Sequence, residues 1–279
     1  MLDRERLDGV IIATPDHHHA LPTILACQRD LDVYVEKPLT LTIGEGRAMV
    51  AAATKHQRVV QVGSQQRTMQ VNRFACEFIR DGNLGDVHLV QLRNYPGPAR
   101  YESLIPNPAR QTVSGDIDWN LFCGPTPLRA YDRDLWVKDD YKRGFLTWRG
   151  WDLFRSYSGH LMTNWGGHGV DMVQYALGTD ATGPVRVEIR KDELDRYIDD
   201  MWHDKTPPVG SIEDDREDKL RFAPVSFHYA NGTELRLDPG VRAAIFHGSR
   251  GTMHVSRNRY TTDPENLAPP PDPAEQAKW

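Results

Sequence analysis

Short apolar runs alternate with amphipathic segments through the first third of the chain. Strands are predicted at 10–13, 33–35 and 59–62, where brief runs rich in Val and Ile end at a polar or turn residue. Helices are predicted between them, at 20–29 and 45–55, because apolar or alanine-rich positions there suit a helix. Strands and helices alternating at this spacing predict βαβ units with right-handed crossovers and a parallel sheet.

The second half of the chain has a different pattern. A helix at 71–80 leads to a strand at 87–95, and a later helix at 165–177 is followed by Gly178 as a stop signal. Two strand pairs are then predicted around tight turns: 225–229 with 235–237 around Asn231-Gly232, and 243–247 with 252–256 around 248–251. This half is therefore predicted to be an antiparallel sheet with helices on one face.

The remaining segments are predicted to be loops. Residues 211–218 are acidic and indicate a solvated excursion, and residues 264–273 contain five prolines, which indicates an extended tail or connector. The predicted domains are therefore a partial dinucleotide-binding domain at 1–68, a substrate-binding and oligomerisation domain at 69–260, and a proline-rich tail at 261–279.

Composition narrows the class of protein. The chain has 279 residues, of which 39% are hydrophobic and 26% charged, so a globular protein with a real core is expected. A net charge of −5 argues against a nucleic-acid surface. Three scattered cysteines without a CxxC pair favour a reducing compartment, and no apolar run approaches the ~20 residues that span a bilayer. A cytoplasmic protein is expected, with an upstream targeting signal left open.

Polar clusters follow the three predicted parallel strands. They are 14–17, 36–38 and 63–66, and they should lie side by side, because ligands of open α/β sheets bind beyond the carboxyl ends of the strands. The glycine-rich GxGxxG loop that opens a dinucleotide fold is not in the sequence. The nearest match, Gly44-Glu45-Gly46, is better explained as a helix start. We therefore expect further strand–helix units, including that loop, upstream of Met1.

Histidines suggest a metal site only weakly. His17, His18 and His19 are adjacent, and neighbouring loop residues seldom converge on one ion. No carboxylate or cysteine has ligand-like spacing to them, so no metal is predicted. His160 near His168 leaves a metal in the second domain as the weaker alternative.

Four motifs together resemble the Gfo/Idh/MocA oxidoreductases, the relatives of glucose–fructose oxidoreductase and inositol dehydrogenase. The resemblance runs from about Leu7 to Val255 and lacks the N-terminal glycine-rich segment. It implies a partial Rossmann-like parallel sheet followed by an α+β domain with an open-faced antiparallel sheet. The motifs are Val10-Ile-Ile-Ala-Thr-Pro-Asp-His17, Val35-Glu-Lys-Pro-Leu39, Gly82-Asn-Leu-Gly85 and Asn164-Trp-Gly-Gly-His-Gly-Val-Asp171.

The resemblance assigns Lys37 to the reaction centre, where an ammonium can stabilise the negative charge that develops on a substrate oxygen. A solvent lysine in a loop is the alternative. His168 is the candidate general base, since an imidazole accepts protons near neutral pH; the alternative is a buried structural histidine. Asn164, His168 and Asp171 have the spacing of one helical face, so Asp171 is predicted to orient the imidazole or to bind a substrate hydroxyl.

Asn164 stands where many relatives have aspartate, and it is either a substrate-binding residue or a helix N-cap. The resemblance places the first two strand-end loops around the nicotinamide. The predicted cofactor-side residues are Thr14, Pro15, His17, Glu36, Lys37 and Gln65; ordinary turn chemistry is the alternative.

Five of the seven tryptophans fall between residues 119 and 165. Aromatic faces form the walls of sugar pockets, so Trp151 and Tyr157, with Arg149, are predicted to bind substrate. A core or oligomer-interface cluster is the equally weighted alternative.

The predicted function is an NAD(P)-dependent oxidoreductase, with NAD or NADP as cofactor, acting on a CH–OH group of a sugar, sugar derivative or polyol. Lys37 and His168 are expected to face each other across the substrate. One rival is a sugar lyase or hydrolase that works by transient oxidation with retained NAD. A truncated, dimerising scaffold without cofactor is the other. A homo-oligomer, dimer or tetramer, is expected through the open sheet face, with no nucleic-acid or membrane partner.

Overall fold

The computed structural model describes residue 2 and residues 4–95, 117–131, 151–189, 225–238, 241 and 243–277. The chain forms two compact units, each with its own β-sheet. The first comprises Met1–Gly63 and Gly97–Asn164, and the second comprises Ser64–Pro96 and Trp165–Trp279. These units do not coincide with a division at residues 68 and 260, because Gly97–Asn164 groups with the N-terminal sheet. The predicted domain boundaries stay a prediction.

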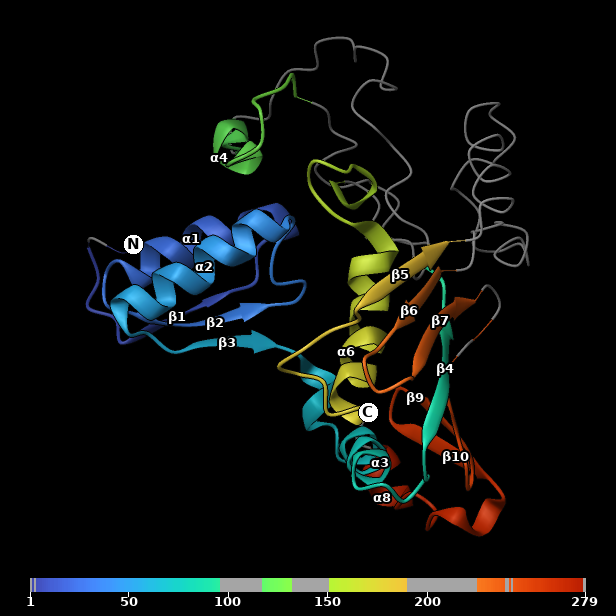
Figure 1. The fold of residues 1–279 in the computed structure, drawn as a ribbon. Helices are drawn as coiled ribbons and strands as arrows, with labels where there is room; N and C mark the ends of the chain where they lie inside the picture. Colours follow the sequence, from blue (N-terminus) through green and yellow to red (C-terminus); the bar gives the residue numbers. More distant parts are fainter. Residues whose placement is uncertain are drawn as a thin grey trace. The chain divides into compact units, whose positions relative to one another are not determined.

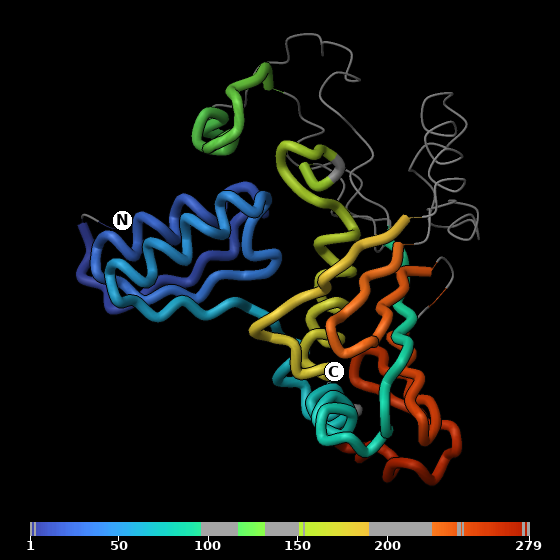
Figure 2. Tube along the Cα trace, viewed as in Figure 1, coloured from blue at the N-terminus to red at the C-terminus, as the bar shows by residue number. Residues whose placement is uncertain are grey.

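The sheet of the first unit is parallel and confirms the predicted βαβ pattern. Its strands are β1 (Gly9–Ile12), β2 (Asp32–Glu36) and β3 (Val60–Gly63), hydrogen-bonded in the order β1-β2-β3. Helices α1 (Ala20–Cys27) and α2 (Ile43–His56) pack together on the same face of this sheet, as Figures 1 and 2 show. In the register, Glu36 at the end of β2 lies opposite Gly63 at the end of β3, so both strand ends meet at one edge.

Strand alternation decides which side chains enter the core of this unit. Ile12, Val33 and Val35 are buried with residues of α1 and α2, whereas Ile11 and Tyr34 point to the other face and are 80% and 39% exposed. The start of α2 is a capping box: Glu45 donates its backbone N–H to Thr42 Oγ1, and its carboxylate accepts from the Thr42 N–H. Gly44-Glu45-Gly46 is therefore a helix start.

The other described residues of the first unit form short helices and turns around an aromatic cluster. The elements are the 3₁₀ turns η1 (Asp16–His18) and η5 (Trp151–Leu153), helix α4 (Trp119–Cys123), and the beginning of the π-helical turn η6 (Met162–Gly166). The cluster of buried residues comprises Trp119, Cys123, Phe154 and Tyr157. Arg149, Trp136 and Trp148 lie outside the described residues, as does the acidic segment 211–218.

The sheet of the second unit has seven strands in the order β10-β9-β8-β4-β7-β6-β5. The hairpin predicted at Asn231-Gly232 is confirmed as β6/β7, with Gly232 at φ +89°, and the second predicted pair is β8/β9. The strands are β4 (Val87–Arg93), β5 (Arg186–Ile189), β6 (Val225–His228), β7 (Glu234–Asp238), β8 (Ala244–Gly248), β9 (Gly251–Ser256) and β10 (Arg259–Asp263).

One feature of this sheet differs from the prediction: it is mixed, because β4 runs parallel to β7 and antiparallel to β8. Hairpin signals identify only partners that are adjacent in sequence. The partners of β4 come from far along the chain, and a parallel pair needs such a long connection.

The helices of the second unit lie on one face of its sheet, as predicted (Figure 1). Helix α3 (Gln70–Arg80) follows the 3₁₀ turn η2 (Gln65–Thr68) and packs on β9 and β10, while α6 (Gly167–Ala176) packs on α3 and β4. At Gly169 a Cβ atom would lie 2.7 Å from Leu92 Cδ1, so this close helix–strand approach requires glycine. Gly178, at φ +66°, ends the segment as predicted.

The C-terminal segment is more ordered than a proline-rich tail. The turn η8 (Glu265–Leu267) and helix α8 (Pro273–Ala277) lie within it. Ala268 is buried, and Tyr260 donates its hydroxyl to the carbonyl oxygen of Pro269 at 2.6 Å. Proline content signals an extended backbone, which here packs against the sheet that precedes it.

Candidate active site

Lys37 follows β2 at the carboxyl edge of the parallel sheet, and its ammonium group is held in place. Lys37 Nζ donates to Asn164 Oδ1 at 2.5 Å and to the backbone oxygen of Asn164 at 3.1 Å. Both partners belong to the first unit. The solvent-lysine alternative is therefore not what the structure has, because the side chain is fixed by two hydrogen bonds.

Glu36, the residue before it, shapes the same edge. Its carboxylate accepts the backbone N–H of Lys37 at 3.3 Å and lies directly over Gly63 of the neighbouring strand. A Cβ atom at position 63 would come within 2.9 Å of the Glu36 carboxyl group. Glycine at the end of β3 thus leaves the space that this carboxylate occupies.

His19 ties together the loops that follow β1 and β2. Its Nδ1 lies 2.6 Å from the carbonyl oxygen of Pro38, its Nε2 lies 2.8 Å from that of Thr14, and the side chain is 1% exposed. Carbonyl oxygens only accept, so the imidazole is the donor in its contacts with these loops. Because Pro38 adjoins Lys37, the imidazole fixes the backbone that presents the ammonium.

The Thr14-Pro15 loop is a tight turn at the edge of the same sheet. Thr14 Oγ1 donates to the carbonyl oxygen of His18 at 3.1 Å, and the Pro15 oxygen accepts the His18 N–H at 2.8 Å. Thr14 is exposed. The turn chemistry left open by the sequence is therefore present, and it leaves the threonine at the surface of the carboxyl edge.

His17 and Tyr157 lie in the core, and their predicted roles in cofactor and substrate binding stay predictions. Both are almost fully buried, with ring centroids 4.6 Å apart in an edge-to-face contact. His17 Nε2 hydrogen-bonds the Phe122 oxygen at 2.8 Å, and Tyr157 donates to Cys123 Sγ at 3.7 Å. Burial lowers the pKa of His17 to about 4 and raises the pKa of Tyr157 to about 12, so both stay neutral at pH 7.

Acidic groups are buried beside this cluster. Ser158 donates to Asp16 Oδ2 at 2.7 Å, while burial raises the pKa of the Asp16 carboxyl and the serine hydrogen bond opposes that rise. His160 Nδ1 lies 3.4 Å from Asp152 Oδ2, and both side chains are nearly inaccessible. Trp151, predicted to bind substrate, is half-buried, with its ring centroid 6.5 Å from that of His17.

His168 belongs to the second unit and lines a cavity there. It lies in the first turn of α6, is 8% exposed, and shares the cavity wall with Trp165, Tyr95 and Arg93. The cavity volume is about 140 Å³. His168 is thus buried against open space rather than against a fully packed core, as a proton acceptor for a ligand requires.

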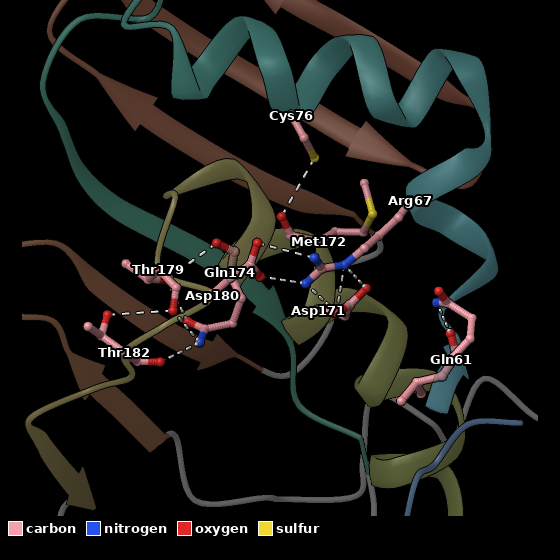
Figure 3. A network of polar contacts seen from close by, with 10 residues as sticks. Gln61, Arg67, Cys76, Asp171, Met172, Gln174, Thr179, Asp180 and Thr182 are labelled. Atoms are coloured by element: carbon pink, nitrogen blue, oxygen red, sulfur yellow. Dashed lines mark hydrogen bonds and ion pairs between the residues drawn. The ribbon is translucent and has the colours of Figure 1, made fainter. Parts of the chain in front are cut away.

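Asp171 is engaged with Arg67. The guanidinium donates to both carboxylate oxygens of Asp171, at 2.7–3.0 Å, and to both of Asp180, at 2.7 and 3.2 Å, as Figure 3 shows. The Asp171 hydrogen bonds raise the pKa of Arg67 further above its usual range. This fork joins η2 to α6; a contact from Asp171 to His168 or to a substrate hydroxyl stays a prediction.

Asn164 is not the N-cap of the following helix. Helix α6 begins at Gly167 with Gly166 as its N-cap, and Asn164 lies within the π-helical turn η6. Its side chain accepts from Lys37 instead of from a helix N–H. Gln65 begins η2, where its backbone oxygen accepts from Thr68 Oγ1 at 2.9 Å.

The histidine triplet is used for packing and loop contacts. His18 Nε2 lies 2.7 Å from the Leu121 oxygen, next to the contacts of His17 and His19 given above. Among the described residues no group of three or more His, Cys, Asp or Glu side chains is arranged to hold a metal ion. In the same part of the chain, no helix is long and apolar enough to cross a membrane.

Several of these residues carry no local sequence signal. His19 could be singled out only as a histidine at a loop–helix junction. Arg67 lies one turn before a helix, and its partners come from a segment more than one hundred residues away. The arginines of the cavity, Arg93 and Arg257, lie on separate strands or turns and meet only in the fold.

Comparisons with known proteins assign the class. Residues 1–64 match the model described as "Oxidoreductase family, NAD-binding Rossmann fold", and residues 105–278 match "Oxidoreductase family, C-terminal alpha/beta domain". The chain is therefore an oxidoreductase-family protein with an NAD-binding Rossmann segment. It belongs to the Gfo/Idh/MocA family, which confirms the resemblance read from its motifs.

Two sequence relatives are similar over short segments. The chain is 31% identical over 87 residues to a 2,7-anhydro-N-acetylneuraminate hydratase of Mediterraneibacter gnavus, covering 31% of this chain and 23% of that protein. It is 31% identical over 90 residues to the rhizopine catabolism protein MocA of Rhizobium meliloti, covering 32% and 28%. The chain thus matches less than a third of the length of either relative.

Solved structures share the fold. The WlbA dehydrogenase from Bordetella pertussis, in complex with NADH and UDP-GlcNAcA, has a TM-score of 0.55 at 17% identity, covering 93% of this chain and 59% of that one. The inositol dehydrogenase homologue from Azotobacter vinelandii, complexed with NADH and myo-inositol, has a TM-score of 0.52 at 16% identity, covering 94% and 55%.

The carboxyl edge of the parallel sheet fits a nicotinamide nucleotide in its hydrogen-bonding chemistry. Thr14 offers an exposed hydroxyl, and the Glu36 carboxylate has acceptor capacity beyond its contact with the Lys37 N–H. Both groups suit ribose hydroxyls, and they lie where open α/β sheets bind ligands.

Proposed function

We propose that this protein is an NAD(P)-dependent oxidoreductase that transfers hydride between a nicotinamide and the carbinol carbon of a sugar, sugar derivative or polyol. The observation that carries the proposal is the Lys37 ammonium, held by Asn164 at the carboxyl edge of a Rossmann-type sheet. Family membership supports the oxidoreductase class. Thr14, Pro15, Glu36 and Gln65 would hold the NAD or NADP, which supplies the hydride acceptor when bound.

Lys37 stabilises the substrate oxygen in this scheme. When a C–H hydride leaves a carbinol carbon, the hydroxyl must lose its proton, and negative charge develops on its oxygen. A fixed ammonium beside that oxygen needs little reorganisation as the charge appears. Asn164 holds the ammonium in place, because its backbone oxygen and its Oδ1 both accept from Lys37 Nζ. Neither oxygen carries a charge that would neutralise the ammonium.

His168 is the proposed acceptor of the hydroxyl proton. Its imidazole lines a cavity in which a substrate hydroxyl can approach, and neutral imidazole is a suitable base near pH 7. Asp171 acts at a distance in this scheme: through Arg67 it anchors α6, and thus the backbone that carries His168.

Two further properties belong to the proposal, the cellular location and the oligomeric state. Cytoplasmic location is supported by the three cysteines, all of which are free and buried. Self-association through the second sheet is supported by exposed apolar residues on its edge strand β5, Val187 and Ile189, which are 57% and 43% exposed. Light scattering of the purified protein would report the oligomeric state directly.

The test is a substrate screen with the purified protein and NAD⁺ or NADP⁺. Sugars and polyols are added, and reduced nicotinamide and oxidised sugar are both quantified. Net, stoichiometric reduction supports the proposal. Sugar cleavage or dehydration without net reduction would replace it with chemistry through transient oxidation, for which the hydratase relative is a precedent by name. Absence of nicotinamide binding, followed by protein fluorescence, would leave the scaffold hypothesis.

A further inference from the structure

The cavity beside His168 has the chemistry of a binding site for an acidic group. Its described lining residues all belong to the second unit, where the ends of β4 and β9 meet the start of α6. Its walls are apolar, aromatic, amide and basic. They are formed by Gln66, Asn72, Leu92, Arg93, Tyr95, Trp165, His168, Gly169, Met172, Ala243, Ala244, Val255, Ser256 and Arg257.

Among the described residues that line the cavity, the charged side chains have one sign. Arg93 and Arg257 are cationic, His168 can become so, and none of the described residues that line the cavity is aspartate or glutamate. Basic side chains around a small concave space create a positive potential, which attracts an anion. The guanidinium fork also matches the two oxygens of a carboxylate or phosphate.

Neighbouring contacts hold the wall in shape before any ligand binds. The Arg93 guanidinium lies over the Tyr95 ring, 5.2 Å from its centroid. Asn72 donates to Gln66 Oε1 at 3.0 Å and accepts the Asn258 N–H at 2.8 Å. These contacts use the amide of Asn72 on both sides and occupy the acceptor of Gln66, so Gln66 offers its NH₂ group, a donor suited to an anion.

The size of the cavity limits what enters it. Its volume is about 140 Å³, whereas pockets that enclose a whole drug-sized ligand measure roughly 300–1,000 Å³. That is room for an acidic group and the carbon atoms next to it, with the rest of the molecule outside.

We propose that this cavity binds the oxyanion of an acidic sugar, a carboxylate in the first place, so that the substrate class is sugar acids rather than neutral sugars. The inference rests on the proposed oxidoreductase function, because it assigns the cavity to the same substrate on which His168 acts. Arg93 and Arg257 are specificity-determining residues in this scheme. Guanidinium groups recognise carboxylate and phosphate alike, and the experiment below separates the two.

The experiment compares matched sugars on the purified full-length protein. Glucuronate, galacturonate and gluconate are paired with glucose, galactose and sorbitol, and glucose 6-phosphate distinguishes phosphate from carboxylate. Kinetics with NAD⁺ or NADP⁺ and equilibrium binding by calorimetry are measured for the wild type, Arg93→Gln and Arg257→Gln. Arg259→Gln is the control, since Arg259 is exposed on β10 and does not line the cavity.

At least one acid should bind more tightly than its neutral partner. Either cavity variant should weaken that binding roughly 10- to 100-fold, as loss of a charge-assisted hydrogen bond predicts, and leave the neutral sugar nearly unchanged. Melting temperatures check folding, and exposed Arg257 is the position where folding is least at risk.

Equal affinity for every acid–neutral pair, or equal losses for both partners in the two variants, would overturn the proposal. Preference for glucose 6-phosphate over all three carboxylates would reassign the site to phosphate. Calorimetry measures binding to the cavity even when no sugar is oxidised. Acid-selective binding without turnover would contradict the oxidoreductase function alone, whereas turnover without acid selectivity would contradict the anion site alone.

Discussion

The family motifs identify both Lys37 and His168, but the two side chains lie in different surroundings. The Lys37 loop is fixed from several sides: Asn164 holds the ammonium, Glu36 accepts the backbone N–H, and buried His19 bridges to the adjoining loop. His168 lies in helix α6 and lines a cavity. One turn further along the same helix, Asp171 forms an ion pair with Arg67. The comparison teaches that contacts within the protein fix the Lys37 ammonium before a ligand binds, whereas the His168 imidazole borders space that a ligand can occupy.

This difference predicts how mutations divide. Changes around Lys37 should act through geometry and stability, because the contacts there are made within the protein. Changes around His168 should act through the ligand. The predictions below follow in order of decreasing expected effect.

The largest loss is expected for His168→Ala. Removing a general base lowers kcat by about 10²- to 10⁴-fold, and the acidic limb of the pH profile of kcat/KM should disappear with it. The melting temperature should change little, since the side chain borders a cavity. A variant that keeps both the rate and the acidic limb would show that another group accepts the proton.

Acid should destabilise the first unit, which contains both Lys37 and the buried His17. The pKa of His17 falls from 6.5 in the unfolded chain to about 4 in the folded protein because the ring is buried. The unfolded state therefore binds more protons than the folded state between these pH values. The free energy of unfolding should fall as the pH falls from 6.5 toward 4, by a total on the order of 3 kcal/mol.

Denaturant titrations at several pH values check this, with His17→Phe against the exposed control His254→Gln. The raised pKa of Asp16 gives a slope of opposite sign, so the difference between the variant and the wild type is the quantity to read. Parallel pH profiles for wild type and His17→Phe would contradict a buried, neutral His17.

His19→Gln tests the bridge between the two loops. Glutamine cannot replace both hydrogen bonds at once from this position, so a buried carbonyl oxygen loses its donor, at a cost of about 1–3 kcal/mol. Since the bridge holds the backbone of Pro38, kcat should fall with it while KM changes less. Thermal unfolding and steady-state kinetics report the two effects, and a stable variant with full kcat would refute the positioning role.

Asn164→Ala should cost the least, about tenfold in kcat, because Lys37 keeps its charge and its bond to the backbone oxygen of residue 164. Asn164→Asp keeps an acceptor for the ammonium and should retain more activity than the alanine variant. Equal rates for both variants would mean that the side chain does not orient Lys37.

Elements built from local contacts were predictable, and the surroundings of the site were not. The three parallel strands, the capped start of α2 and the hairpin at Asn231-Gly232 follow from periodicity and turn chemistry within a few residues. The β4/β7 pairing joins strands far apart in the chain, so no local pattern indicates it.

The candidate site divides in the same way. Lys37 and His168 were found through motifs, yet the motifs did not predict that Lys37 would be bonded to Asn164, 127 residues away. The burial of His17 and Tyr157 was not predicted, because histidine and tyrosine are intermediate in burial preference and their neighbours come from a distant segment.

The most direct test of the account is the rate of hydride transfer in a single turnover with Lys37→Met. With a substrate identified by the screen, the wild type and the variant are mixed with bound nicotinamide and sugar, and exposed Lys55→Met serves as the matched control. The account predicts a slowing of about 10²- to 10³-fold for Lys37→Met with sugar affinity nearly retained, and no change for the control. A wild-type rate in Lys37→Met would contradict the assignment of its ammonium to the reacting oxygen.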